Sequence, residues 1–179
     1  MTAHDAKTTA LTAHFQNTLG AAGGAVWDFD VEALYDDSNT ISTAALLAPF
    51  SCSEAHAAIR GMNAHSAPGP DGFGPSFYKA AWSTVRPRLM AFLEGFHNLD
   101  VELKRINRSY IVLIPKTAAA VTVNAFRPIC LQNCDVKVAS KILTTRLQRK
   151  LHHLIDLDQT AFLQGRSISE SFVYAMELV

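Results

Sequence analysis

Two short apolar runs lie near the middle of the chain: Tyr110-Ile111-Val112-Leu113-Ile114 and Phe126-Arg127-Pro128-Ile129-Cys130-Leu131. The first run is rich in β-branched residues and ends at Pro115, so its length and composition favour a buried strand over a helix. The second run is just as short. Because a ten-residue connection, 116–125, separates the two runs, they predict an antiparallel hairpin with a mobile tip.

Helical periodicity precedes the hairpin. Ser51 with Glu54 three residues later is a capping-box pattern, in which each side chain satisfies a backbone N–H of the first helical turn. Ala55, Ala58, Ile59 and Met62 then recur at helical spacing. A wide apolar stripe predicts a long helix from about residue 75 to residue 97. Pro87 falls inside this helix, so we expect a kink or break near residues 84–86.

A second long helix is predicted after the hairpin, over about residues 136–155. One face is apolar and includes Ala139, Ile142, Leu143 and Leu147, and the other is basic, with Lys137, Lys141, Arg149 and Lys150. Ser167 with Glu170 is a second capping-box pattern, which predicts a further helix near the end of the chain. Before the first long helix, Pro68 to Gly72 is a rigid turn with no predicted chemical role.

Composition restricts the class of protein. The chain has 179 residues, of which 49% are hydrophobic, enough for a buried core. Three cysteines without framework spacing fit a reducing compartment, and no run is long enough to cross a bilayer. The N-terminus has no secretory pattern. We therefore expect an intracellular, soluble protein with no membrane partner; nucleus and cytoplasm both stay open.

Charge is unevenly distributed in a chain whose net charge is zero. Residues 1–50 carry six acids and one lysine, whereas residues 79–150 carry thirteen Lys and Arg and four acids, a net charge of +9. A basic block of this kind suits a polyanion such as nucleic acid or a triphosphate, although a solvated basic face is the alternative. Residues 1–49 are predicted to be a partly disordered linker or leader, and residues 50–179 part of a domain.

A series of motifs in a fixed order is more specific than composition. The motifs are Pro68-Gly69-Pro70-Asp71-Gly72-Phe73, Phe77-Tyr78, Leu113-Ile114-Pro115-Lys116, Phe126-Arg127-Pro128-Ile129, Ser140-Lys141-Ile142-Leu143 with Arg146-Leu147, and Ala161-Phe162 with Gly165-Arg166-Ser167-Ile168. This series resembles the N-terminal half of the reverse transcriptase domain of LINE-type (non-LTR) retrotransposons, of the kind abundant in plant genomes. The resemblance covers about residues 50–179.

The resemblance implies an α+β fold: the mainly helical fingers of a right-hand polymerase with one antiparallel β-hairpin and a truncated palm. It also implies that Lys116 and Arg127 point at the triphosphate of the incoming nucleotide. Phosphoryl transfer needs fixed positive charge around the leaving pyrophosphate, and a guanidinium can hold two oxygens at once. The alternative is that Lys116 is a solvated loop lysine and Arg127 a cap at a strand end.

Further residues acquire roles through the same resemblance. Phe162, Gly165 and Arg166 match a segment that lies near the template strand and the nucleotide pocket, where Gly165 would allow close approach of the backbone and Arg166 would contact phosphate. The alternative is a turn at a helix entry with a surface arginine. Lys137 and Lys141 are candidates to contact the nucleic-acid backbone, and a solvated helix face is their alternative.

In this family the reaction uses two Mg²⁺ ions held by carboxylates: one aspartate comes early in the palm, and a pair comes from a Tyr-x-Asp-Asp hairpin. Neither pattern occurs in these 179 residues, because Asp36-Asp37 follows Tyr35 directly and lies upstream of the hairpin. We therefore expect no cofactor or metal in this fragment, and zinc is disfavoured because Cys130, Cys134, His152 and His153 do not have ligand spacing.

The expected function is that of a fragment of an RNA-directed DNA polymerase, inactive alone. Its partners would be RNA template, DNA primer, deoxynucleoside triphosphate, and the missing palm and thumb regions of a parent polyprotein. The alternatives are a non-catalytic nucleic-acid-binding module and a non-functional retroelement remnant.

Overall fold

A computed structural model describes residues 3–20, 43–155, 159–160, 163–167, 169, 172–173 and 176. The chain divides into two compact units. The hairpin unit contains residues 111–129 and the N-terminal helix α1 (Ala3–Leu19), and the helical unit contains the described residues of 35–110 and 130–179. The fold is α+β, as predicted. None of the helices in the described ranges is long and apolar enough to span a lipid bilayer.

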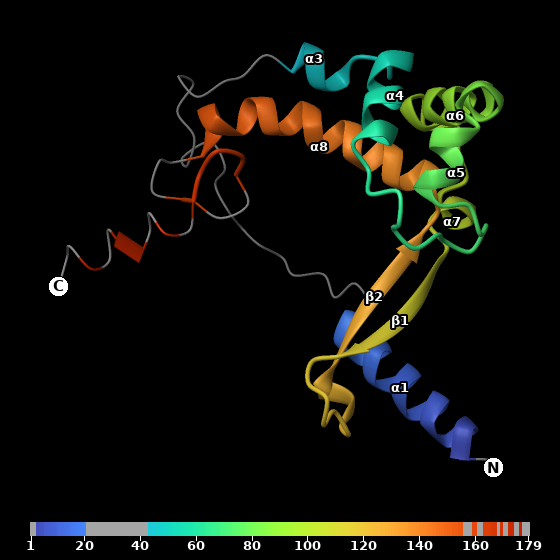
Figure 1. The fold of residues 1–179 in the computed structure, drawn as a ribbon, viewed down its shortest axis with the longest axis vertical. Coiled ribbons are helices and arrows are strands. Elements are labelled where there is room, and N and C mark those ends of the chain that lie inside the picture. Colours follow the sequence, from blue (N-terminus) through green and yellow to red (C-terminus); the bar gives the residue numbers. More distant parts are fainter. Residues whose placement is uncertain are drawn as a thin grey trace. The chain divides into compact units, whose positions relative to one another are not determined.

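The predicted hairpin is confirmed. Strand β1 (Ser109–Pro115) pairs with strand β2 (Phe126–Gln132) in a two-stranded antiparallel sheet (Figure 1). The loop contains a short 3-10 helix, η2 (Val123–Ala125). At the loop end, the Lys116 N–H donates to the Ala125 carbonyl at 2.8 Å.

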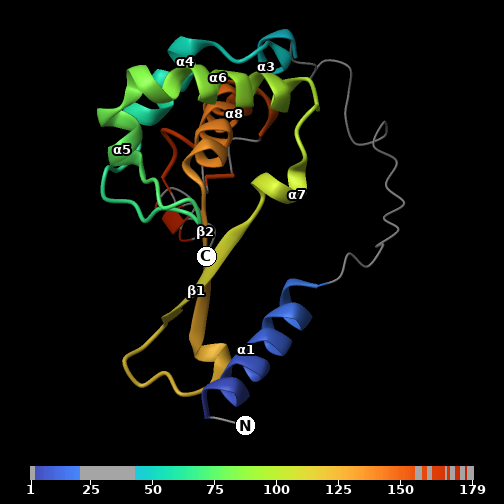
Figure 2. The ribbon, with the colours of Figure 1, turned by 90° about the vertical axis from the view of Figure 1, so that its right-hand side faces the viewer.

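The prediction that the first strand is buried is wrong. Ile111, Val112 and Ile114 are 48%, 42% and 47% exposed. The composition of a strand indicates β-structure but not what covers it, and among the described residues the sheet has only two strands. Within the hairpin unit, Ile111 and Leu113 of β1 line a groove of about 720 Å³ together with α1; Figure 2 shows α1 and the hairpin.

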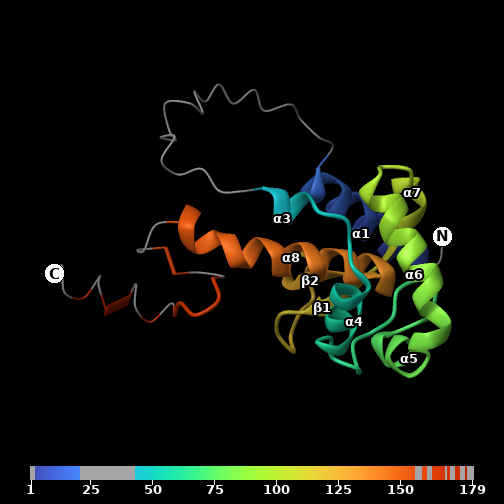
Figure 3. The same cartoon turned by 90° about the horizontal axis from the view of Figure 1, so that it is seen from above.

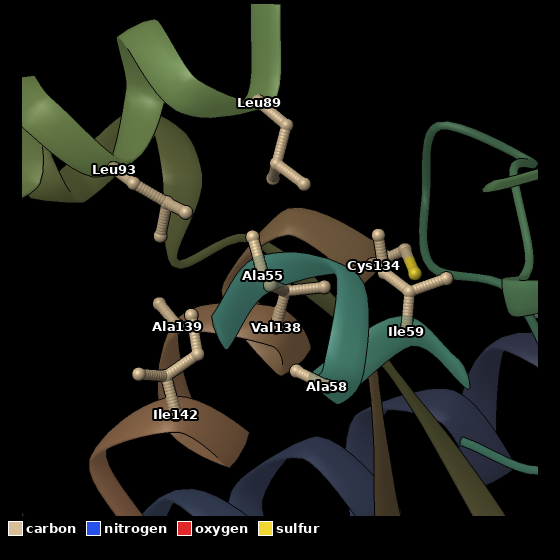
Figure 4. Packing of buried hydrophobic residues seen from close by; sticks show 9 residues of the cluster. All are labelled: Ala55, Ala58, Ile59, Leu89, Leu93, Cys134, Val138, Ala139 and Ile142. Atoms are coloured by element: carbon tan, nitrogen blue, oxygen red, sulfur yellow. The ribbon is translucent and has the colours of Figure 1, made fainter. Parts of the chain in front are cut away.

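The helical unit is built on one long helix, α8 (Cys134–Leu154), as predicted. Before α8, the described part of this unit contains α3 (Ala44–Leu47), α4 (Cys52–Arg60), α5 (Pro75–Ala80), α6 (Trp82–His97) and α7 (Leu103–Ile106). Helices α4 and α6 pack against α8 (Figure 3). Their core joins residues at helical spacing from three helices (Figure 4): Ala55, Ala58 and Ile59 of α4, Leu89 and Leu93 of α6, and Cys134, Val138, Ala139 and Ile142 of α8.

Two helix predictions need correction. The helix expected over residues 75–97 is interrupted at Ala81 (φ −102°, ψ 27°), upstream of the break predicted near residues 84–86. Because α6 starts anew at Trp82, Pro87 falls in its second turn, and only the Ser83 carbonyl loses a helical donor to the proline ring.

The apolar face of α8 was also assigned incorrectly in part. Ala139 and Ile142 are buried as predicted, but Leu143 and Leu147 are 40% and 43% exposed. The buried positions recur every four residues from Cys134 through Val138 and Ile142 to Arg146. The helix therefore places a charged residue, Arg146, on its buried face.

Every N–H donor of the Arg146 guanidinium has an acceptor. Nε and Nη2 donate to the two Glu54 carboxylate oxygens at 2.7 and 2.8 Å. Nη2 also donates to the Pro49 carbonyl at 2.9 Å, and Nη1 donates to the carbonyls of Leu46 and Ala48. The guanidinium carbon lies 4.9 Å from the centre of the Phe50 ring. Arg146 is only 7% exposed. Its five hydrogen bonds, the negative charge of Glu54 and the face of the Phe50 ring together offset the cost of burying the guanidinium charge.

The predicted capping box completes this cluster. The Glu54 N–H donates to Ser51 Oγ at 3.2 Å, and the Ser51 N–H donates to Glu54 Oε2 at 2.9 Å. The hydrogen bonds from Arg146, opposed in part by burial, lower the pKa of the Glu54 carboxyl from 4.5 to about 2. One carboxylate therefore both caps α4 and neutralises the arginine on α8.

We predict that Glu54 makes stability depend on pH between about 4.5 and 2. Its pKa is lower in the folded protein than in the unfolded chain, so its contribution is present above pH 4.5 and is lost as pH falls toward 2. Glu54→Gln should lower the free energy of unfolding at pH 7 by about 1–2 kcal/mol and flatten this dependence. Urea unfolding at several pH values measures both.

The comparison of wild type with Glu54→Gln cancels the contribution of other carboxyls, such as Asp135, whose pKa is raised mainly by burial. An unchanged difference between the two proteins from pH 7 to pH 2.5 would contradict this assignment.

Candidate nucleotide and nucleic-acid interface

The hairpin places Lys116 and Arg127 at its loop end. Lys116 is the first residue after β1, and Arg127 is the second residue of β2. Both side chains are exposed. Lys116 Nζ donates to the Asn124 carbonyl at 2.7 Å, which ties it to the loop. The Arg127 side chain donates no hydrogen bond within the described residues, so its guanidinium faces solvent.

In the helical unit, the loop between α4 and α5 closes on the start of α8. Lys137 Nζ donates to the Ala67 carbonyl at 2.8 Å, and the Asp71 N–H donates to Asn133 Oδ1 at 3.2 Å. Gly69 is buried so closely against the backbone of Gln132 and Asn133 that a Cβ there would collide with it. The Pro68–Gly72 turn is therefore a packing element, and Gly69 is needed for close approach of two backbones.

A groove of about 540 Å³ lies beside this junction. It is lined by Lys137, Ser140, Lys141 and Thr144 of α8 and by residues that follow α4, among them Asn63 and Ser66. Lys137 and Lys141 are four residues apart and thus lie on the same face of the helix. The structure brings these two predicted residues together at the edge of one groove.

The segment after α8 is described only in part. Gly165 has φ +84°, which explains a glycine at this turn, but a Cβ there would meet nothing within 4 Å among the described residues. The close approach of this backbone to the template or nucleotide stays a prediction. Phe162 lies outside the described residues, and so does Glu170, so the predicted Ser167–Glu170 capping box stays a prediction.

Arg166 donates to two carbonyls near the end of α8. Nη1 donates to the Gln159 carbonyl at 2.7 Å and Nη2 to the Ile155 carbonyl at 3.2 Å. Ile155 is the C-cap of α8, so the arginine supplies donors where the helix leaves carbonyls without helical partners.

The basic residues of the predicted site thus fall into two classes. Lys116, Lys137 and Arg166 donate to main-chain carbonyls. Arg127 and Lys141 are exposed, and their side chains donate no hydrogen bond within the described ranges. The second class can bind an anion without first giving up an internal partner.

Two structurally important residues were not recognised in the sequence. Arg146 has a signal that could have revealed it: it continues the spacing of Val138 and Ile142 on the buried face of α8, and a charged residue at a buried position requires a partner. Asn133 precedes α8 and accepts from Asp71 in a loop 62 residues away. No local pattern indicates such a long-range hydrogen bond.

Among the described residues, no group of three or more His, Cys, Asp or Glu side chains could hold a metal ion. Asp156 and Asp158 lie outside those residues. The Mg²⁺ that the resemblance implies for a full-length enzyme thus has no matching set of ligands in the described chain, and we assign none.

Comparison with known proteins gives one informative similarity. The chain is 28% identical over 132 residues to the transposon TX1 uncharacterized 149 kDa protein of Xenopus laevis. The matched region is 73% of this chain and 10% of that protein, so the chain spans about a tenth of the relative's length. No family model matches the sequence. The similarity supports a transposon origin for the chain.

We predict that Gly69→Ala lowers the free energy of unfolding by about 1–3 kcal/mol, because the new methyl group forces apart the α4–α5 loop and the β2–α8 junction. Gly61→Ala is the matched control. Its φ is −77° and the new Cβ would lie 3.4 Å from the Ala57 carbonyl oxygen, an ordinary contact. We expect a change within about 0.5 kcal/mol for this control. Equal urea midpoints for the two variants would show that the α4–α5 loop does not pack closely against the β2–α8 junction at Gly69.

Proposed function

We propose that this chain is the nucleotide- and template-binding fingers part of an RNA-directed DNA polymerase of a LINE-type retrotransposon. Three features support the proposal: the order of the motifs, the antiparallel hairpin with basic residues at its loop end, and the similarity to a transposon protein. The hairpin is the observation that carries it.

The chemistry of the hairpin end fits a triphosphate. The hydrogen bond from the Lys116 N–H to the Ala125 carbonyl joins the two strands where the basic side chains begin. Arg127, with an exposed planar guanidinium, would hold two phosphate oxygens. The Lys116 ammonium would give up its hydrogen bond to the Asn124 carbonyl and bind a third phosphate oxygen. A charged oxygen is a stronger acceptor than a neutral carbonyl, so this exchange is favourable.

The template would lie along the groove beside α8. Lys141 is exposed at its edge, and Ser140 and Thr144 lie one turn apart on the same wall. Lys137 contributes charge there but also holds the Ala67 carbonyl, so it would act mainly by positioning the loop. Contacts of this kind are to phosphate and carry no sequence preference.

This proposal predicts that removing the charge of Arg127 and removing the charge of Lys141 weaken the binding of different ligands. Arg127→Ala should weaken binding of a deoxynucleoside triphosphate about tenfold, since a charge-assisted hydrogen bond contributes about 1.5–3 kcal/mol, and should change template affinity less. Lys141→Ala should reduce the salt slope of primer–template binding by about 0.7–0.9 and leave triphosphate affinity unchanged. Fluorescence anisotropy with labelled primer–template, and calorimetry with the triphosphate, measure these effects.

Arg108→Ala is the control, because it removes the same charge just before β1, at the other end of the hairpin. It should change triphosphate affinity little. If Arg108→Ala and Arg127→Ala lose the same triphosphate affinity, the effect is one of net charge, and the proposed triphosphate site is wrong. Because these 179 residues contain no Tyr-x-Asp-Asp sequence, we expect binding without primer extension; template-dependent extension by the pure chain would contradict this part.

A further inference from the structure

A second cavity in the helical unit has a different chemistry from the groove beside α8. Its volume is about 670 Å³, and its walls come from α5, α6, the 71–73 loop and the first turn of α8. The residues that decide its character are Asp71, Phe73, Phe77, Tyr78, Arg88 and Asp135. None of them belongs to the predicted nucleotide or template site.

One wall is aromatic and solvent-accessible. Phe73 and Phe77 are 47% and 40% exposed, and their ring centres lie 4.6 Å apart. Tyr78 lines the same cavity and is half-buried, and its burial raises the pKa of the phenol, which keeps it neutral. Aromatic faces carry partial negative charge and attract cations.

The cavity also contains two carboxylates without a cationic partner in the described part of the chain. Asp71 Oδ1 accepts the Phe73 N–H at 3.0 Å, and Asp135 Oδ1 accepts the Val136 N–H at 2.8 Å. Neither forms a salt bridge with a described residue; Arg88 lines the cavity but pairs with neither. Burial and the nearby Asp71 raise the pKa of Asp135, so its charge is poorly compensated.

We propose that this cavity binds the cationic end of an arginine or lysine side chain presented by a partner protein. The carboxylates neutralise the charge, and the exposed phenylalanines cover the apolar stem and attract the cation through their faces. Nucleic acid is disfavoured here because its phosphates would approach two carboxylates. This partner site shares no residue with the proposed triphosphate and template sites and does not depend on them.

Two peptides that differ in one side-chain group test the proposal on the full 179-residue chain: acetyl-Gly-Leu-Arg-Leu-Gly-amide and the same peptide with citrulline, the neutral and nearly isosteric analogue, in place of arginine. We expect the arginine peptide to shift the NMR signals of Phe73, Phe77 and Asp135, and the citrulline peptide to bind at least fivefold more weakly. Asp135→Asn should weaken arginine-peptide binding by a similar factor. Arg88→Gln, which removes the competing cation, should strengthen it.

Equal binding of the two peptides, or unchanged binding to Asp135→Asn, would overturn the proposal. Ethylguanidinium serves as a free small cation: if it binds and the arginine peptide does not, the site takes a small molecule and the partner-protein assignment is wrong. If Asp135→Asn loses the dispersed NMR spectrum of a folded protein, Asp71→Asn takes its place, since asparagine keeps the oxygen that accepts the Phe73 N–H. Unchanged binding to Asp71→Asn would then overturn the proposal.

Discussion

The helical unit depends on one buried guanidinium. Arg146 lies on the face of α8 that packs into the core, and its five N–H groups bind Glu54 and the carbonyls of Leu46, Ala48 and Pro49. A buried charge without partners would cost several kcal/mol. The segment before α4 must therefore follow the path that supplies the three carbonyls. Glu54 couples this requirement to α4, because the same carboxylate caps that helix.

Other cationic side chains also donate to main-chain carbonyls, as Arg146 does. These side chains hold the fold together, and their charge is less available to a ligand. Lys79 binds the carbonyls of Arg60 and Met62, at the end of α4, and Lys137 binds that of Ala67. The net charge of +9 over residues 79–150 therefore overstates what is available to a polyanion. Within the described chain, Arg127 and Lys141 are the members of the predicted site whose side chains donate to nothing, which is why the functional proposal rests chiefly on them.

Local patterns predicted the elements of this fold well, because their causes are local. The Ser51–Glu54 box, the two strands around a ten-residue loop and the long helix α8 all depend on neighbours within a few residues. Burial was predicted less well. Whether Ile111 or Leu143 is covered depends on which surfaces meet, and a strand or helix pattern does not encode that. The spacing of Val138 and Ile142 marks the position of Arg146 as buried, but its acceptors lie 92 to 100 residues upstream, and no local pattern identifies them. For the candidate site, the sequence identified the basic residues, but only the contacts show which of them bind carbonyls.

Urea unfolding of Arg146→Lys tests the central claim most directly. Lysine keeps the charge but has three donors on a compact ammonium, so it cannot reach three carbonyls and both carboxylate oxygens from one plane. If the arginine organises the helical unit as described, the free energy of unfolding should fall by about 3 kcal/mol or more. A wild-type unfolding midpoint for Arg146→Lys would show that charge alone is sufficient and would contradict the account.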